Sequence, residues 1–148
     1  ISEQIRNSIV ILQQKWEEKK LDVSVEGEDI KLFGNEEFLS QVWINLLDNA
    51  IKFAPKGSQI DISIMQEADS FIYKIIDYGP MIDENTRERM FDKFYQGDKS
   101  HSTAGNGLGL TLVKRIVNLH DGTIDCDSKE DGTTFIVTLP IHSPEEAN

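Results

Sequence analysis

The chain has 148 residues, of which 15 are Lys or Arg and 26 are Asp or Glu, so its formal net charge is −11. This length suits one domain with or without a short appendage, and the acidic balance disfavours nucleic-acid binding, which needs a basic surface. One cysteine and three histidines exclude a disulfide scaffold and disfavour a structural zinc site. Charged residues interrupt every apolar run well before the roughly 20 residues that cross a bilayer, and no signal-peptide pattern is visible. We therefore expect a soluble acidic domain from a reducing compartment.

The spacing of apolar residues predicts helices and strands in an irregular order. In chain order, we expect a helix at 2–20, strands at 19–27 and 30–33, a helix at 35–53, strands at 59–66 and 71–77, a helix at 83–95, an aperiodic stretch at 96–106, a helix at 107–120, and strands at 123–128 and 133–139. Asn35 is placed to cap the second helix. This order predicts an α+β fold, a two-layer α/β sandwich in which helices cover one face of a mixed sheet.

Helix 35–53 carries three polar side chains at the border of its apolar face. At about 100° per residue, Asn45, Asn49 and Lys52 fall within one narrow stripe. Amide oxygens one turn apart can coordinate Mg²⁺ directly or through water, and a lysine further along can neutralise a phosphate. Two alternatives remain open: these are ordinary helix-surface residues, or Asp48 and Lys52 simply form an i,i+4 ion pair.

Three glycines lie just before and within the first turn of the helix at 107–120, at Gly105, Gly107 and Gly109. The unpaired N–H groups and the dipole at such a helix start favour phosphate, although a flexible hinge is the alternative. No strand directly precedes the run and no Gly-Lys-Ser/Thr follows, so it is neither a dinucleotide fingerprint nor a Walker loop. The apolar face of this helix is expected to consist of Leu108, Leu112, Val113, Ile116, Val117 and Leu119.

Taken in order, these segments resemble the ATP-binding catalytic domain of sensor histidine kinases, in the wider family that includes DNA gyrase B and the heat-shock chaperone ATPases and shares the Bergerat fold. Residues 45–53 (NLLDNAIKF) resemble the asparagine box of that family. The other matching segments are the first glycine box at 77–82, the aromatic box at 91–95, the second glycine box at 105–110, and the closing strand at 132–135 and 139–140. The resemblance covers about residues 21–141.

The resemblance implies a role for each matched residue. Asn49 would coordinate Mg²⁺, Asn45 would support the metal or its water shell, and Lys52 would contact phosphate. Asp77 would accept a hydrogen bond from the exocyclic amine of adenine, and residues 96–106 would form a lid over the triphosphate. The remaining residues implied to bind nucleotide are Phe53, Gly79, Ile82, Lys93, Phe94, Tyr95, Gly105, Gly107, Leu108, Gly109, Leu110 and Thr133.

The implied activity is transfer of the γ-phosphate of ATP to a histidine on a separate dimerisation module, for signalling to a response regulator. Hydrolase members of the family carry a water-activating Glu four residues before the metal-binding Asn. Asn45 stands at that position and its amide cannot act as a general base, which favours transfer over hydrolysis. The alternatives are a nucleotide-binding module with impaired catalysis, an ATP hydrolase of the same fold, and a protein-interaction domain without ligand.

Two positions depart from the family pattern. Met81 stands where the first glycine box usually has a second glycine, and we expect a side chain there to weaken nucleotide affinity. Gln96 stands where many relatives have Arg after the aromatic box. Neutralisation of the phosphates would therefore depend on Lys52, Lys93 or Lys99.

The phosphoacceptor histidine is expected to lie outside this chain. None of His101, His120 and His142 has the Ser/Thr-His-Glu helical context of the family, and all three are expected to be solvated or structural. Residues 1–20 are interpreted as the end of a dimerisation helix and its linker, 21–142 as the catalytic domain and 143–148 as a tail. We expect the fragment to be monomeric and cytoplasmic, and the full-length protein to be a homodimer anchored in the bacterial cell membrane.

Overall fold

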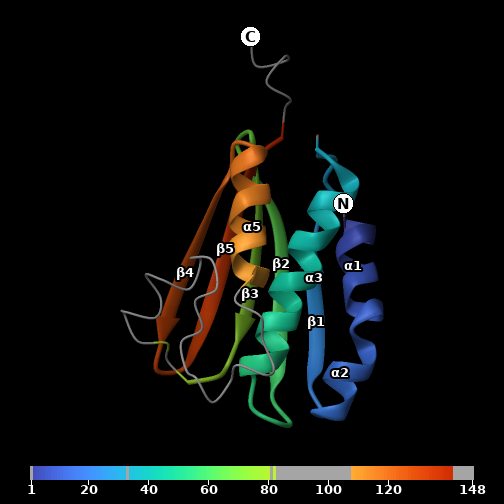
Figure 1. Ribbon diagram of the computed structural model, residues 1–148, viewed down its shortest axis with the longest axis vertical. Coiled ribbons are helices and arrows are strands. Elements are labelled where there is room, and N and C mark those ends of the chain that lie inside the picture. The colour runs from blue at the N-terminus through green and yellow to red at the C-terminus, as the bar shows by residue number, and fades with distance from the viewer. Residues whose placement is uncertain (1, 33, 81, 83–107, 142–148) are drawn as a thin grey trace.

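Figure 1 shows the computed structural model, which describes residues 2–32, 34–80, 82 and 108–141. The expected helix at 83–95 and the aperiodic stretch at 96–106 lie outside these residues. The described elements are α1 (Ser2–Ile11), α2 (Gln13–Glu18), β1 (Asp22–Gly27), α3 (Glu36–Phe53), β2 (Gln59–Glu67), β3 (Ser70–Asp77), α5 (Leu108–Leu119), β4 (Thr123–Lys129) and β5 (Gly132–Pro140).

The strands form one mixed sheet in the order β1-β2-β3-β5-β4. β1 runs parallel to β2, while the other three neighbouring pairs are antiparallel. α3 and α5 lie side by side on one face of this sheet (Figure 1). The architecture confirms the predicted α+β fold with a mixed sheet and helices on one face.

The core lies between α3 and the inward-facing residues of the central strands. Along each strand these residues alternate with outward-facing ones, as expected when one face of the sheet is covered. The inward-facing residues are Ile60, Ile62, Ile64, Phe71, Tyr73, Ile75, Phe135, Val137 and Leu139. Trp43 of α3 packs on Phe71 and Tyr73, with ring centroids 5.8 and 4.7 Å apart. Large buried rings contribute much of a core's stability. These ring contacts therefore fix α3 against β3, and the ends of these two elements carry the candidate site.

The helix expected at residues 2–20 forms two helices instead of one. The chain turns at Leu12 (φ −97°, ψ 11°), which buries the Leu12 side chain. Trp16 then donates from Nε1 to the carbonyl of Ile9 at 3.0 Å. α1 packs against α3: Ile5 is fully buried, and Gln4 accepts a hydrogen bond from Nε1 of Trp43 at 2.8 Å.

Two local expectations are wrong. Residues 30–32 form no strand, and Phe33 lies outside the described residues. Ile30 is buried from a loop, because a short apolar segment can fill a core without joining a ladder. On α5, Leu112 and Leu119 are 40% and 65% exposed. They lie roughly 100° and 120° around the helix from the buried Val113, outside the sector that faces the sheet.

Candidate active site

The polar stripe on α3 lies where the sequence predicts it. The helix begins after Asn35, whose side chain accepts a hydrogen bond from Phe38 N at 3.0 Å. Asn45, Asn49 and Lys52 are all half-buried, as expected at the border of an apolar face. The Nδ2 atom of Asn49 is buried and has no hydrogen-bond partner within the described residues. An amide left unpaired in this way is suited to receive a polar ligand.

Asp48 and Lys52 do not pair with each other. The carboxylate of Asp48 accepts from Nζ of Lys15 on α2 at 2.9 Å. Nζ of Lys52 lies 5.4 Å from the ring centroid of Phe53, within the range of a cation–π contact. The i,i+4 ion pair considered from the sequence is therefore wrong, and Lys52 stands beside Phe53 at the end of the helix.

Asp77 ends β3 as a buried carboxylate, 2% exposed. Its neighbours across the sheet are the uncharged Ile60 and Thr133. Burial raises the pKa of Asp77 to about 6, while the Gly79 N–H and the positive charge of Lys19 act in the opposite direction. The Gly79 N–H donates to Oδ1 of Asp77 at 3.0 Å and fixes the orientation of the carboxyl group.

Two glycines allow three segments to meet around Asp77. A Cβ atom on Gly79 would lie 2.3 Å from the backbone carbonyl oxygen of Phe53. A Cβ atom on Gly132 would lie 2.5 Å from the backbone carbonyl oxygen of Asp77. The family resemblance implies that Gly79 lets the backbone approach the base of a nucleotide. In the structure, the atom it makes room for is the Phe53 carbonyl oxygen. The end of α3, the loop after β3 and the start of β5 thus converge.

Ser128 belongs to the candidate site through its contacts, and the sequence patterns did not single it out. Its hydroxyl lies 2.7 Å from Oγ1 of the buried Thr133 and accepts from the Ile82 N–H at 2.8 Å. Ser128 therefore orients two predicted nucleotide-binding residues at once. A signal was present in the alternation of β4, where Ile124, Cys126 and Ser128 face inward and only the last is a hydroxyl.

The structure describes some of the remaining predicted nucleotide-binding residues and not others. Gly109 and Leu110 lie half-buried in the first turn of α5, and Leu108 begins that helix. The predicted residues outside the described part of the chain are Lys93, Phe94, Tyr95, Gly105 and Gly107. The positions at which the sequence departs from the family pattern, Met81 and Gln96, and the alternative phosphate partner Lys99 also lie there.

His120 has a structural role, as expected. Its Nε2 atom accepts from the Asn35 N–H at 3.0 Å, and its Nδ1 atom lies 2.8 Å from the carbonyl oxygen of Ile116. With Nε2 accepting, Nδ1 is the atom that carries the proton and donates to Ile116. The ring thus links the end of α5 to the start of α3.

Within residues 2–32, 34–80, 82 and 108–141, no three His, Cys, Asp or Glu side chains are grouped closely enough to hold a metal ion. A cation beside Asn49 would instead be held by an amide oxygen, phosphate oxygens and water, which is a common arrangement for Mg²⁺. The partnerless Nδ2 atom of Asn49 is a donor and suits a phosphate oxygen or a water beside the cation, while the cation itself would need Oδ1.

Residues 34–143 match the family described as histidine kinase-, DNA gyrase B- and HSP90-like ATPases. The chain belongs to this ATPase family. The solved structures that it resembles include the nucleotide-free catalytic domain of the histidine kinase ThkA, with a TM-score of 0.87, 27% identity, and coverage of 99% of this chain and 95% of that one. The mycobacterial sensor histidine kinase MprB aligns with a TM-score of 0.83 and 26% identity over 94% of this chain and 93% of that one. This chain is a histidine kinase-type ATP-binding catalytic domain.

Curated relatives of this catalytic domain include the heme sensor protein HssS of Staphylococcus aureus strain Newman, 37% identical over 144 residues. The alignment covers 97% of this chain and 31% of HssS, so the chain spans about a third of that relative's length. ThkA in complex with the response regulator TrrA also aligns, with a TM-score of 0.81 and 26% identity over 96% of this chain and 40% of that one. No helix in the described ranges is both long enough and apolar enough to cross a membrane.

Proposed function

We propose that this domain binds ATP with Mg²⁺ and transfers the γ-phosphate to a histidine on a separate dimerisation module. The observation that supports this most strongly is the buried carboxylate of Asp77, which lies beside the end of the helix that carries Asn49 and Lys52. A buried acid costs free energy unless a partner uses it. If that partner is an adenine base, the end of α3 supplies the polar groups that the attached triphosphate needs.

Asp77 would select adenine over guanine. Its ionised carboxylate is an acceptor only, and one oxygen is already engaged by the Gly79 N–H. The exocyclic amine of adenine can donate to the other oxygen. Guanine presents a carbonyl oxygen at the same ring position, so two acceptors would face each other in a buried site.

The last turns of α3 would hold the phosphates and the metal. Lys52 would neutralise phosphate charge, Asn49 would contribute an amide oxygen to Mg²⁺, and Asn45 would support the water shell. When bound, Mg²⁺ would neutralise charge on the phosphate oxygens. Gly105, Gly107, Leu108, Gly109 and Leu110 would supply the helix start for the triphosphate, and Lys93, Phe94 and Tyr95 would contact the nucleotide, as the family resemblance implies.

Asn45 favours transfer over hydrolysis. Its Nδ2 atom donates to the carbonyl of Gln41 at 2.7 Å, so the side chain is held as an amide with a fixed orientation. An amide cannot remove a proton from water. The acceptor would therefore be an imidazole nitrogen, which attacks the γ-phosphorus while the bond to the β–γ bridging oxygen breaks and ADP leaves. The imidazole proton passes to solvent, and the protein contributes positioning and charge neutralisation.

The whole protein would be a membrane-anchored homodimeric sensor kinase with this domain in the cytoplasm. ATP is available in the cytoplasm, and the single cysteine suits a reducing compartment. The pairing of ThkA with the response regulator TrrA supports a response regulator as the downstream partner.

Phosphotransfer to a separately purified module tests the proposal. The domain is incubated with γ-labelled Mg-ATP and the histidine-bearing dimerisation module of its own parent protein. We expect acid-labile, base-stable phosphate on the module, and none when its acceptor histidine is replaced by Gln. Asp77→Asn in the domain should reduce labelling.

Two other outcomes would contradict the proposal. Phosphate release at the same rate without the module would indicate a hydrolase. ATP binding without any labelling of the parent protein's own module would indicate a nucleotide-binding module without catalysis.

A further inference from the structure

The last turn of α3 is completed by a side chain from outside the helix. The carbonyl of Ile51 would normally accept from the residue four positions on, but that residue is Pro55, which has no N–H. Nζ of Lys19 takes this place, donating to the carbonyl of Ile51 at 2.7 Å and to that of Lys52 at 3.1 Å. The next carbonyl, of Phe53, lies against Gly79. Lys19 therefore fixes the turn that contacts the Asp77 loop.

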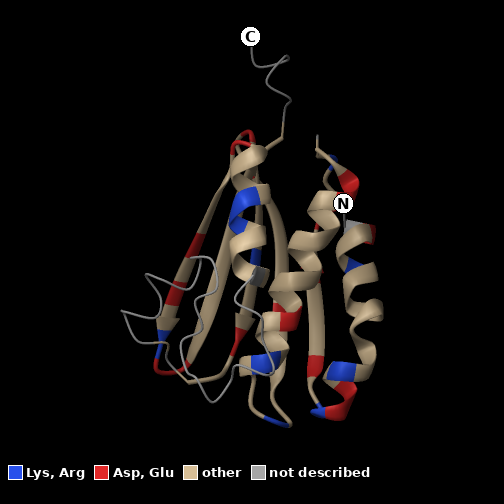
Figure 2. Cartoon of the chain, viewed as in Figure 1, with Lys and Arg blue, Asp and Glu red and all other residues tan. Residues whose placement is uncertain are grey.

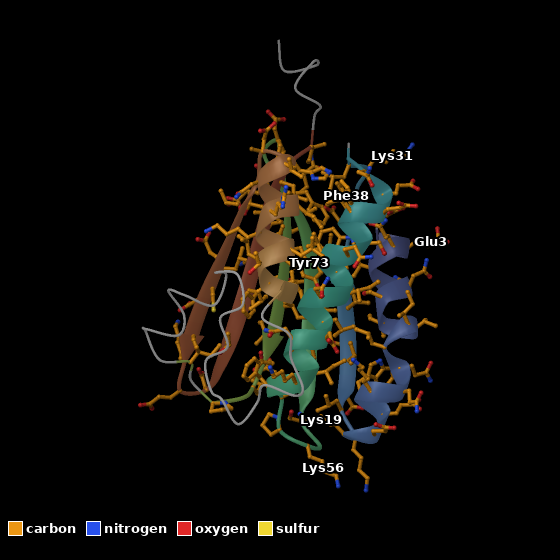
Figure 3. All side chains as sticks on the ribbon, in the orientation of Figure 1. Glu3, Lys19, Lys31, Phe38, Lys56 and Tyr73 are labelled. Atoms are coloured by element: carbon orange, nitrogen blue, oxygen red, sulfur yellow. The ribbon has the colours of Figure 1, made fainter. Side chains whose placement is uncertain are left out.

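Lys19 is itself held by its surroundings. It directly follows α2, and its carbonyl accepts from the Gly57 N–H at 2.9 Å, which ties it to the turn after α3. One turn earlier, Lys15 pairs with Asp48 at 2.9 Å. Figure 3 places Lys19 at the end of the molecule where α3 terminates, and Figure 2 shows basic positions on α2 and on the last turns of α3 at that same end.

Lys19 is also the charged group, among the described residues, that acts on Asp77. Its positive charge opposes the burial that raises the pKa of the Asp77 carboxyl, and Asp77 in turn opposes the desolvation that lowers the pKa of Lys19. The strand neighbours of Asp77 carry no charge. The other nearby acids, Asp61 and Asp131, act on the adjacent Tyr78, whose hydroxyl donates to Asp61 at 2.6 Å.

We propose that Lys19 is a positioning residue of the nucleotide site, because one ammonium completes the last turn of α3 and places a positive charge beside the carboxylate that recognises adenine. The inference rests on the proposed function. It connects the chain segment just after α2 to nucleotide affinity through the end of α3 and through Asp77. A displacement of α2 would then weaken ATP binding.

The affinity for ADP between pH 5.5 and 8.5 tests this proposal, measured by calorimetry on the 148-residue chain. With Asp77 ionising near pH 6 in the unmodified domain, ADP binding should weaken below that pH. Lys19 lowers the pKa of the Asp77 carboxyl, and for the loss of one such opposite charge we expect that pKa to rise by about one unit. Lys19→Met should therefore weaken ADP binding about fivefold at pH 6 through this effect, and progressively less as the pH rises to 8.5.

Three comparisons separate positioning from general destabilisation. Lys20→Met removes the same charge from the adjacent, exposed residue and should leave the pH profile unchanged. Lys19→Arg retains charge and donors and should restore most of the affinity. Purine riboside diphosphate, which lacks the exocyclic amine, should not show the pH-dependent loss. A loss with Lys19→Met that is equal at all pH values, or equal to that of Lys20→Met, would overturn the proposal.

NMR of the Asp77 carboxyl carbon, in the absence of nucleotide, separates this inference from the proposed function. A higher midpoint in Lys19→Met supports the Lys19–Asp77 link even if no ADP binds, in which case only the proposed function fails. An unchanged midpoint overturns the link whether or not ADP binds.

Discussion

Replacing Asp77 by Asn should stabilise the nucleotide-free domain. The folded protein holds this carboxyl with a pKa of about 6, against an ordinary value of 3.8, because burial disfavours the ionised form. The folded state thus binds the proton more tightly than the unfolded state. Stability is therefore lost as the pH rises from 3.8 through 6, and the whole penalty is present above that range.

The size of the penalty follows from the two pKa values. At about 1.4 kcal/mol per pKa unit, the difference corresponds to about 3 kcal/mol at pH 7.5 and about half of that at pH 5. Asparagine carries no charge and keeps an oxygen for the Gly79 N–H, which donates to Oδ1 of Asp77. For a domain of this size, removing the penalty should raise Tm by roughly 6–12 °C at pH 7.5.

Urea and thermal unfolding at pH 7.5 and pH 5 measure this gain. Asp125→Asn makes the same chemical change at an exposed position of β4 and should change stability little at either pH. Asp77→Asn should also weaken ADP binding by about tenfold or more, since a charged hydrogen bond is lost. Equal stability of Asp77→Asn and the parent at pH 7.5, or a gain that does not depend on pH, would show that the Asp77 carboxylate does not destabilise the folded domain.

Three further changes have defined expectations. Gly79→Ala places a methyl group against the Phe53 carbonyl, 2.3 Å from where its Cβ would lie, and should lower both Tm and ATP affinity; unchanged affinity in a calorimetric titration would contradict the contact. His120→Ala removes the acceptor for the Asn35 N–H and should cost about 1–2 kcal/mol in urea unfolding, with ATP affinity unchanged. Met81→Gly should tighten ATP binding, and the absence of any gain would refute the role assigned to the Met81 side chain.

The local pattern of the sequence was sufficient to predict the helix at the centre of the site. Asn35 caps α3, and Asn45, Asn49 and Lys52 lie at the border of its apolar face, because helical period and capping depend on residues close in the chain. The strands were predicted for the same reason, since their alternation matches one covered face of a sheet.

The contacts that assemble the site could not be predicted in this way. Lys19 reaches carbonyls more than 30 residues away, and Ser128 joins Ile82 across 46 positions. The periodicity of apolar residues cannot predict such long-range contacts. The short apolar segment at 30–32 was misinterpreted because its pattern fits a strand and a buried loop equally well.

A crystal structure of the domain with Mg²⁺ and a non-hydrolysable ATP analogue would show most directly whether one nucleotide contacts both Asp77 and Asn49. We expect one nucleotide whose exocyclic amine lies within hydrogen-bond distance of the Asp77 carboxylate and whose phosphate-bound metal is contacted by Asn49. Asp77 and Asn49 lining separate cavities, or an adenine bound away from Asp77, would contradict a single site that contains both residues.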